Sequence, residues 1–284
     1  MHPLKKNTDE KGKICQLPKM IYLLTDFGFE GQYYVAQLRG VIQKLCLEDC
    51  KIEDITHAVV PFSVIQAEYF LMTTFPYLRS PCIVIVVVDP GVGSSRDIVA
   101  IKDKDGNYFI GPNNGIFGRF PSKSKIIDVR IIQNQKILTT SVSATFQGRD
   151  IMAPAAAALA NGLSIEELGP PSKPLQVNKL PDVKIGAKFV TGGIYSIDAF
   201  GNIITNIPAT LFKEINLEEG KVIHVQVGYI QEDFTCGVTF SDVEKGGQVV
   251  YVGSAQFLEL GVNRGSAAMV LQAKIGVPIR LLWE

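Results

Sequence analysis

The strongest constraint on the fold is the apolar run Val84–Val88, which stops at the turn sequence Asp89-Pro90-Gly91. An unbroken β-branched run suits a strand that is buried on both faces, as in the middle of a parallel sheet. Asp89 therefore stands at the carboxyl end of a central strand, where open α/β sheets bind ligands. Arg96 follows after seven residues, so the loop can fold back and pair its guanidinium with Asp89.

The sequence around this run alternates between strand and helix patterns. Apolar β-like runs at 20–25 and 51–56 precede the central strand, and the first ends at Asp26. Apolar residues recur at helical spacing over 30–46, at Tyr34, Leu38, Val41 and Leu45. Ser63 is placed to cap a second helix over 64–74, with Gln66 at the capping-box position. This order predicts a mainly parallel α/β sheet with right-handed crossovers.

The chain continues with further strands and one helix before its character changes. Strands at 97–102 and 107–111 flank Asp105-Gly106, a hairpin turn. Strand-like runs follow near 125–132 and 137–139, and an alanine-rich helix is expected from about 150 to 160, stopped by Asn161-Gly162.

A proline-rich segment divides the chain into two domains. It holds four prolines within 169–182 and is interpreted as an extended linker. The runs that follow it are short and β-like, at 187–197, 202–207, 221–230, 248–253, 256–262, 267–273 and 278–283. We therefore expect a flexible tail at 1–18, an α/β domain at 19–168, and a smaller all-β, barrel-like domain at 183–284.

Composition excludes several classes of function. The 284 residues include 28 basic and 28 acidic side chains, so the zero net charge gives no electrostatic footprint for nucleic acid. No apolar stretch reaches the roughly 18 residues of a membrane span. Three histidines are too few to suggest a His-ligated metal or a Ser-His-Asp triad. The five cysteines contain no C-x-x-C pair. Reduced cysteines, Cys46 and Cys50 included, and a polar start without the apolar core of a secretory signal favour a cytoplasmic protein.

Polar groups recur where the expected strands end. Asp26, His57, Asp89 and Asn113-Asn114 each follow a strand, and the segment Thr145–Asp150 leads into a helix. In the second domain, Asp198-Ala199-Phe200-Gly201-Asn202 is a polar turn within a β-rich region. Each of these features is weak alone, but together they indicate a ligand site.

Taken together, these motifs resemble those of a known family, the S-adenosyl-L-methionine (SAM) hydroxide adenosyltransferases, which are relatives of the SAM-dependent fluorinase and chlorinase. The resemblance covers roughly residues 20–284 and keeps the order of the motifs. The residues that carry it are Leu24–Gly28, Leu38–Ile42, Asp54–His57, Val87–Gly93 with Arg96, Pro112–Gly115, Thr145–Asp150, Phe200–Asn202 with Thr205–Ile207, Gly253-Ser254, Glu259 and Asn263–Ala268.

The resemblance implies a specific activity and assembly. Family members are homotrimers that hold SAM between the N-domain of one subunit and the C-domain of its neighbour. Water-derived hydroxide attacks the ribose 5′-carbon and methionine leaves, giving adenosine. SAM is then the substrate, and neither a cofactor nor a metal is implied. A sulfonium is already a good leaving group, so the protein mainly has to position and desolvate the reactants.

Roles transfer to this sequence from the family motifs. Asp26 matches the residue that binds the ribose hydroxyls, and Asp89 with Arg96 matches two members of the water-activating Asp-Arg-His set. The expected substrate contacts are Asp26, Phe75, Phe146, Asp198, Phe200, Asn202, Ser254 and Glu259, with Phe200 stacking on adenine.

Two departures from the family pattern concern the chemistry. Gln147 stands where hydroxide-adding members usually carry histidine, and Asn113 where many carry aspartate. Glutamine can orient water but cannot act as a general base near neutral pH. The sequence thus leaves three hypotheses open: a SAM hydrolase using Asp89, Arg96 and Gln147, a SAM- or adenosine-binding protein with weak or no catalysis, and a SAM-dependent halogenase.

Overall fold

The computed structural model describes residues 17–120, 126–139, 141–214 and 218–283. The chain forms two compact units that meet at the bond between Asn178 and Lys179. The expected tail at 1–18 lies almost wholly outside the described residues. The proline-rich segment is bonded to the first unit up to Asn178. Ile131 N donates to Pro170 O at 2.9 Å, and Gln176 N donates to Asn113 Oδ1 at 2.8 Å.

The first unit is built on a six-stranded sheet with the order β2-β1-β3-β5-β4-β6. Its strands are β1 (Met20–Thr25), β2 (Lys51–Thr56), β3 (Cys82–Val87), β4 (Ile98–Asp103), β5 (Tyr108–Pro112) and β6 (Ile126–Ile131). The first four strands in this order pair in parallel, whereas the β5–β4 and β4–β6 pairs are antiparallel, so β4 alone runs against the other described strands of the sheet. Because the chain passes from β1 to β2 on one side and then to β3 on the other, a topological switch point lies between β1 and β3.

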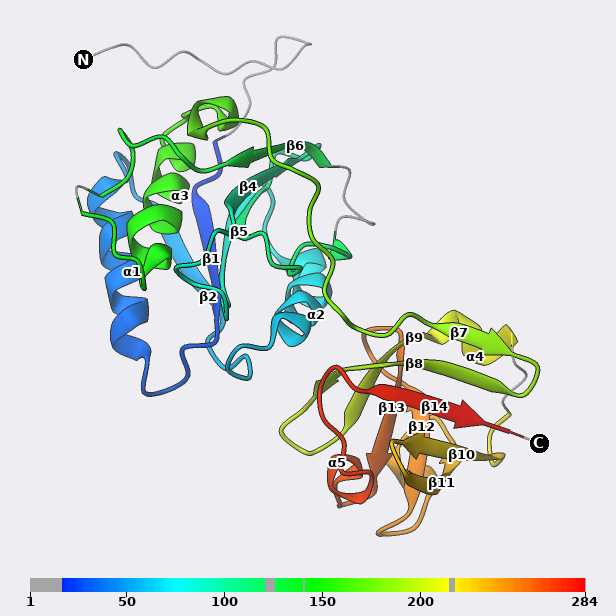
Figure 1. Cartoon of the computed structure of the whole chain (residues 1–284). Coiled ribbons are helices and arrows are strands. Elements are labelled where there is room, and N and C mark those ends of the chain that lie inside the picture. The colour runs from blue at the N-terminus through cyan, green and yellow to red at the C-terminus, as the bar shows by residue number, and fades with distance from the viewer. Residues whose placement is uncertain (1–16, 121–125, 140, 215–217, 284) are drawn as a thin grey trace. The chain divides into compact units, whose positions relative to one another are not determined.

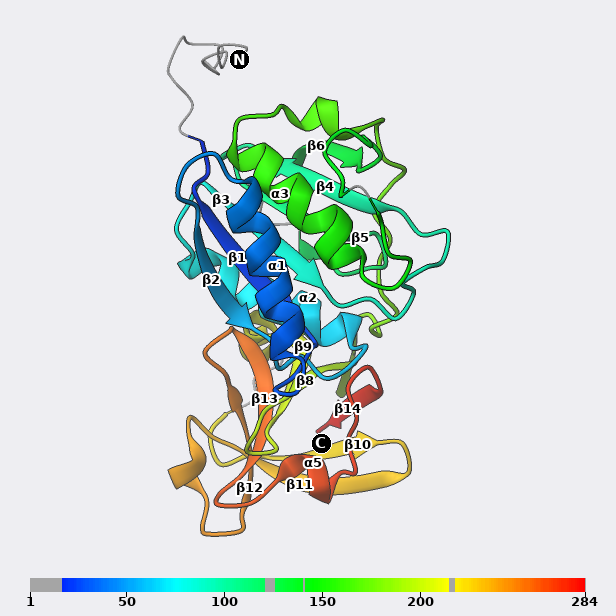
Figure 2. The ribbon, with the colours of Figure 1, turned by 90° about the vertical axis from the view of Figure 1, so that its left-hand side faces the viewer.

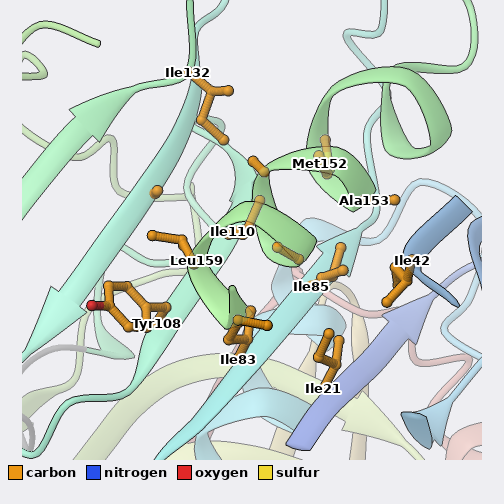
Figure 3. Packing of buried hydrophobic residues seen from close by; sticks show 14 of the residues in the cluster. Ile21, Ile42, Ile83, Ile85, Tyr108, Ile110, Ile132, Met152, Ala153 and Leu159 are labelled. Carbon is orange, nitrogen blue, oxygen red and sulfur yellow. The ribbon is translucent and has the colours of Figure 1, made fainter. Parts of the chain in front are cut away.

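Helices cover both faces of this sheet, which confirms the α/β prediction (Figure 1). Helices α1 (Gln32–Leu45) and α3 (Ala153–Ala160) pack side by side on one face, and α2 (Val64–Thr74) packs on the other. Every residue of β3 is buried, as expected for the central strand. Figure 3 shows isoleucines of β1, β3 and β5 packed under Met152, Ala153 and Leu159.

The caps and boundaries of these helices follow largely from local sequence. Ser63 Oγ accepts from Gln66 N, so α2 begins where the cap predicted. The reciprocal half of the capping box is absent, because Gln66 Oε1 accepts from Val60 N at 2.7 Å instead. The buried stripe of α1 is Val35, Leu38 and Ile42, and Tyr34 and Leu45 are exposed. The buried face of α1 is therefore rotated by about one residue from the face that the sequence predicted.

Two expectations for the first unit were wrong. Residues 137–139 lie in a turn and loop rather than a strand, because the loop before α3 folds over the helix start and Thr139 N bonds Asp150 O. Cys46 and Cys50 form a disulfide rather than remaining reduced. Helix α1 ends at Leu45 and the chain turns back, which brings the two Cα atoms to 6.4 Å, within disulfide range. Cys82 and Cys236 are free and buried.

The second unit is a closed β-barrel, as predicted. Its strands are β7 (Lys184–Gly186), β8 (Phe189–Ile197), β9 (Ile203–Pro208), β10 (Val222–Val227), β11 (Ile230–Cys236), β12 (Gln248–Val252), β13 (Phe257–Val262) and β14 (Pro278–Leu282). The order is β14-β10-β11-β12-β13-β9-β8-β7, and pairing of β14 with β8 closes the barrel (Figure 2).

Two details of the barrel differ from the expected strand runs. The run at 267–273 contains a short helix, α5 (Ala267–Val270), because Ser266 caps it through Met269 N. The run at 221–230 is a hairpin that continues into β11, and a second helix, α4 (Ala209–Glu214), follows β9. Throughout the described segments, no helix is long and apolar enough to cross a membrane.

Candidate active site

The centre of the site is a buried ion pair between Asp89 and Arg96. Arg96 Nε donates to Asp89 Oδ1 at 2.7 Å, and Arg96 Nη2 contacts Asp89 Oδ2. The two side chains are only 7% and 8% exposed. Charges buried this deeply are tolerated when they are paired, so the pair holds the loop after β3 closed. This confirms the pairing predicted from the seven-residue spacing.

Small residues and one amide shape the loop that carries Asp89. Gly91 N donates to Asp89 Oδ1 at 3.1 Å, and Asn114 Nδ2 donates to Val88 O at 3.0 Å. Gly93 has a φ of +82°, and a Cβ there would lie 3.3 Å from Ala144 O. Glycine thus lets this loop approach the segment that leads to Gln147.

Gln147 is bonded directly to the buried arginine. Its Oε1 accepts from Arg96 Nη2. Gln147 precedes a π-helical turn, η3 (Gly148–Met152), a distortion that is frequent at functional sites. Since the amide oxygen is committed to Arg96, the amide nitrogen is the group that remains to donate a hydrogen bond. Arg96 Nη1 is buried, and no acceptor for it exists among the described residues.

Asp26 lies at the end of β1, beside the end of β3 at the switch point. Thr25 pairs with Val87, so Asp26 and Asp89 follow adjacent parallel strands. Burial raises the pKa of the Asp26 carboxyl, and the negative charge of Asp89 adds to this. Hydrogen bonds from backbone N–H groups, including Phe62 N to Oδ2 at 2.8 Å, act in the opposite direction.

A cavity of about 300 Å³ opens beside these groups. Asp26, Asp89, Phe146 and Gln147 all line it, so the fold brings together four of the residues expected from sequence. Arg96 is not in the lining and lies behind Asp89. This volume is at the lower end of the range for small-molecule sites.

Aromatic residues that sequence reasoning did not single out form much of the cavity wall. Phe27 and Tyr34 contact the Phe146 ring at centroid distances of 6.0 and 5.1 Å. Phe62 also lines the cavity, is 68% exposed and has a φ of +68°, which is unusual for a bulky residue. An aromatic directly after Pro61, in the loop behind a strand, was the only signal for it.

The structure places Phe75 away from this cavity. Its ring packs against Phe109 and Phe120 at 5.0 and 5.4 Å, on the α2 side of the sheet. The reason is local: Phe75 begins the 3₁₀ turn η1 (Phe75–Tyr77) that ends α2, and this turn directs the partly buried ring against the core cluster.

The second unit carries its own polar cluster in the turn between β8 and β9. Asp198 Oδ1 accepts from Phe200 N at 2.9 Å and from Asn202 N at 2.8 Å, and Oδ2 accepts from Asn202 Nδ2 at 2.7 Å. Asp198 thereby fixes the turn. Asn202 is buried, whereas the Phe200 ring is 79% exposed and available to stack on a ligand.

Glu259 of β13 lies near this turn. Burial raises the pKa of the Glu259 carboxyl, the charge of Asp198 adds to the effect, and the hydrogen bond from Tyr251 Oη at 3.0 Å opposes it. A Cβ at Gly253 would lie 1.9 Å from Glu259 Oε1, so a larger residue there would have to displace the Glu259 carboxylate from this position. Ser254 follows in the exposed turn between β12 and β13.

Each unit therefore presents a built set of ligand-binding groups. In the described part of the chain, no cluster of three or more histidine, cysteine or acidic side chains is arranged to hold a metal ion. The first unit is an α/β domain with a buried Asp–Arg pair at its switch point, and the second is a barrel with an exposed aromatic and a half-buried carboxylate. These features define a two-domain protein with candidate ligand-binding groups in both units.

Comparison with known proteins gives the family. The SAM hydroxide adenosyltransferase N-terminal domain matches residues 21–169, and the C-terminal domain of the same family matches residues 192–280. The chain belongs to the SAM hydroxide adenosyltransferase family.

Individual relatives agree with this assignment. A Thermus thermophilus protein named (R)-S-adenosyl-L-methionine hydrolase is 35% identical, over 92% of this chain and 99% of the relative. A fluorinase from Nocardia brasiliensis is 23% identical over 92% of this chain and 96% of the relative. The crystal structure of an uncharacterized conserved protein from Thermotoga maritima has a TM-score of 0.84 and 35% identity, covering 93% of this chain and all of that one.

Proposed function

We propose that this protein hydrolyses SAM to adenosine and L-methionine by attack of water on the ribose 5′-carbon. The observation that carries the proposal is the buried Asp89–Arg96 pair, bonded to Gln147, at the edge of the cavity. These groups surround a small volume with a carboxylate acceptor and an amide donor. Such a set can hold and orient one water molecule.

The reaction requires little more than correct positioning of the water and the ribose 5′-carbon. A bond forms between the water oxygen and the 5′-carbon, and the bond from that carbon to sulfur breaks with its electron pair going to methionine. One proton of the water stays on the new hydroxyl and the other is accepted by Asp89. Arg96 fixes the Asp89 carboxylate, and Gln147 is held through its oxygen so that its amide nitrogen can direct the water.

The substrate-binding roles we propose are divided between the two units. Asp26 accepts from the ribose hydroxyls and Phe146 forms part of the apolar wall. In the barrel, Phe200 stacks on adenine, and Asp198, Asn202, Ser254 and Glu259 provide polar contacts. A carboxylate such as Glu259 suits the methionine ammonium, since a charge-assisted hydrogen bond is stronger than a neutral one. No cofactor or metal is required.

We also propose a homotrimer in which the first unit of one subunit and the second unit of its neighbour share each ligand. Support comes from exposed apolar side chains around the cavity segments: Phe29, Tyr33 and Phe62 are 87%, 57% and 68% exposed. Sedimentation measures the oligomer. Mixing subunits of Asp89→Ala with subunits of Glu259→Ala tests the shared site, because a mixed trimer regains some wild-type sites only if the units come from different subunits.

The proposed location is the cytoplasm, supported by the free buried thiols of Cys82 and Cys236. The Cys46–Cys50 disulfide argues for an oxidising compartment. Cell fractionation distinguishes a location in the cytoplasm from one in an oxidising compartment.

The test of the activity is incubation of the protein with each sulfonium epimer of SAM. We expect adenosine and methionine in equal amounts, with the (R) epimer preferred because the Thermus relative is named for it. Labelled water must place its oxygen in the adenosine 5′-hydroxyl. Adenosine as the sole nucleoside product with fluoride or chloride present excludes a halogenase. Binding of adenosine without turnover at high protein concentration would leave the binding-protein hypothesis.

A further inference from the structure

We propose that His57 is a positioning residue, which acts through Thr25 and the neighbouring backbone to hold Asp26 in place for the ligand. The inference rests on the proposed function for its substrate. It concerns a histidine that touches neither the cavity nor the Asp89–Arg96 pair, yet is only 9% exposed at the side chain.

Both nitrogens of the His57 ring face partners. Nδ1 lies 2.9 Å from Thr25 Oγ1, and Nε2 lies 3.1 Å from Asp54 Oδ1. Asp54 is in turn bonded through Oδ2 to Arg39 Nη2 at 2.5 Å. The ring therefore connects β2 and its Asp54–Arg39 ion pair to the last residue of β1, directly before Asp26.

Backbone hydrogen bonds extend this connection on either side of Asp26. Gly28 N donates to His57 O at 2.8 Å, and Val59 N donates to Thr25 O at 3.4 Å. Phe62 N donates to the Asp26 carboxylate itself at 2.8 Å. The segment 57–62 is thus hydrogen-bonded to Thr25, to Asp26 itself and to Gly28. Among the described residues, the bond between His57 and Thr25 is the only hydrogen bond between side chains that joins this segment to β1, beside the apolar packing of Val59.

The hydrogens on this link are determined by chemistry. Thr25 Oγ1 accepts from Phe27 N at 3.3 Å, so its own hydrogen is free to donate to His57 Nδ1. The ring then carries its hydrogen on Nε2, facing the Asp54 carboxylate. In this arrangement the Thr25 hydroxyl donates to the ring and is fixed in one rotamer, while Nε2 faces Asp54 Oδ1 at ion-pair distance without the geometry of a hydrogen bond. The charged groups that face the ring are Asp54 and, beyond it, Arg39.

The consequence is a separation of binding from chemistry. Loss of the ring frees the turn that carries Asp26, which binds the ribose, but leaves the loop from Asp89 to Arg96 on the next strand intact. Substitution of His57 is expected to raise KM for SAM and Kd for adenosine, with kcat little changed. A purely structural role would lower stability and the amount of active protein without changing KM.

The test compares His57→Ala, His57→Asn and His57→Gln in the full-length protein. The asparagine amide can occupy the position of Nδ1 and keep the link to Thr25, whereas glutamine reaches the position of Nε2 toward Asp54. We expect KM and the adenosine Kd to rise about tenfold in the alanine variant, the loss of roughly one hydrogen bond. Asparagine is expected to restore most of this and glutamine little. Thr25→Val must resemble His57→Ala.

The matched control is His224→Ala. His224 Nδ1 pairs with Asp233 Oδ1 at 2.6 Å on an exposed face of the barrel, so the same chemical change should leave KM and Kd unchanged. Unchanged KM and Kd in a folded His57→Ala overturn the proposal, as does a fall in kcat alone. If the alanine variant does not fold, equal constants for the asparagine and glutamine variants overturn it. If wild type binds adenosine without hydrolysing SAM, the proposed function fails and the Kd series still decides the role of His57.

Discussion

The Asp89–Arg96 pair allows a prediction about stability and catalysis together. Asp89→Asn keeps the shape of the side chain but removes its charge, leaving the Arg96 guanidinium 92% buried without a counter-ion. Breaking a buried pair in this way costs about 3–5 kcal/mol. A unit of this size loses roughly 2–4 °C of Tm for each kcal/mol. We therefore expect the Tm of the first unit to fall by roughly 6–20 °C. We also expect kcat to fall by about 10²–10⁴-fold, because the proton acceptor is lost.

The double variant Asp89→Asn with Arg96→Met separates the two effects. It removes the uncompensated charge, so most of the lost Tm should return while activity stays low. Differential scanning calorimetry and initial rates on SAM measure the two quantities. The control is Glu48→Gln, which removes one charge from the exposed pair between Lys19 and Glu48 at 3.0 Å and should cost at most about 1 kcal/mol. A wild-type Tm for Asp89→Asn, or a double variant less stable than either single one, would refute the reasoning.

Three further variants test other parts of the site. The pKa of Asp26 in the folded protein lies above its ordinary 3.8, so ionisation of this carboxyl lowers the stability of the fold as pH rises through that range. Asp26→Asn should therefore raise Tm at pH 7 but not at pH 3, and it should raise KM for SAM. Calorimetry at both pH values checks the sign of the change in Tm. Gly253→Ala would place its Cβ 1.9 Å from Glu259 Oε1 and displace the carboxylate, so the Kd for SAM, measured by calorimetry, should rise at least about tenfold. An unchanged Kd would contradict the proposed contact between Glu259 and the ligand. Gln147→Ala should lower kcat about tenfold or more with KM unchanged, as measured by steady-state rates, and a changed KM alone would move Gln147 to substrate binding.

Much of the first unit could be predicted because its signals are local. The apolar run before Asp89, the Ser63 cap and the Asp105-Gly106 turn each act over a few residues, and the structure keeps all three. The same is true of the Asp89–Arg96 pair, whose partners are seven residues apart. The error at 267–273 was equally local, because a serine cap at Ser266 outweighed an apolar run. The 3₁₀ turn after α2 packs the Phe75 ring against Phe109 and Phe120, outside the lining of the first unit's cavity.

The arrangement of the site depended on contacts that no local pattern carries. Gln147 stands where a histidine is usual in the family pattern, and only the fold shows that it bonds Arg96, 51 residues earlier. Likewise, His57 reaches Thr25 across 32 residues, and Phe62 reaches Asp26 across 36. The sequence by itself determined which polar residues end the strands, because strand and turn preferences act between near neighbours. Which of those residues meet was decided by the order β2-β1-β3, since the pairing of β1 with β3 sets Asp26 beside Asp89.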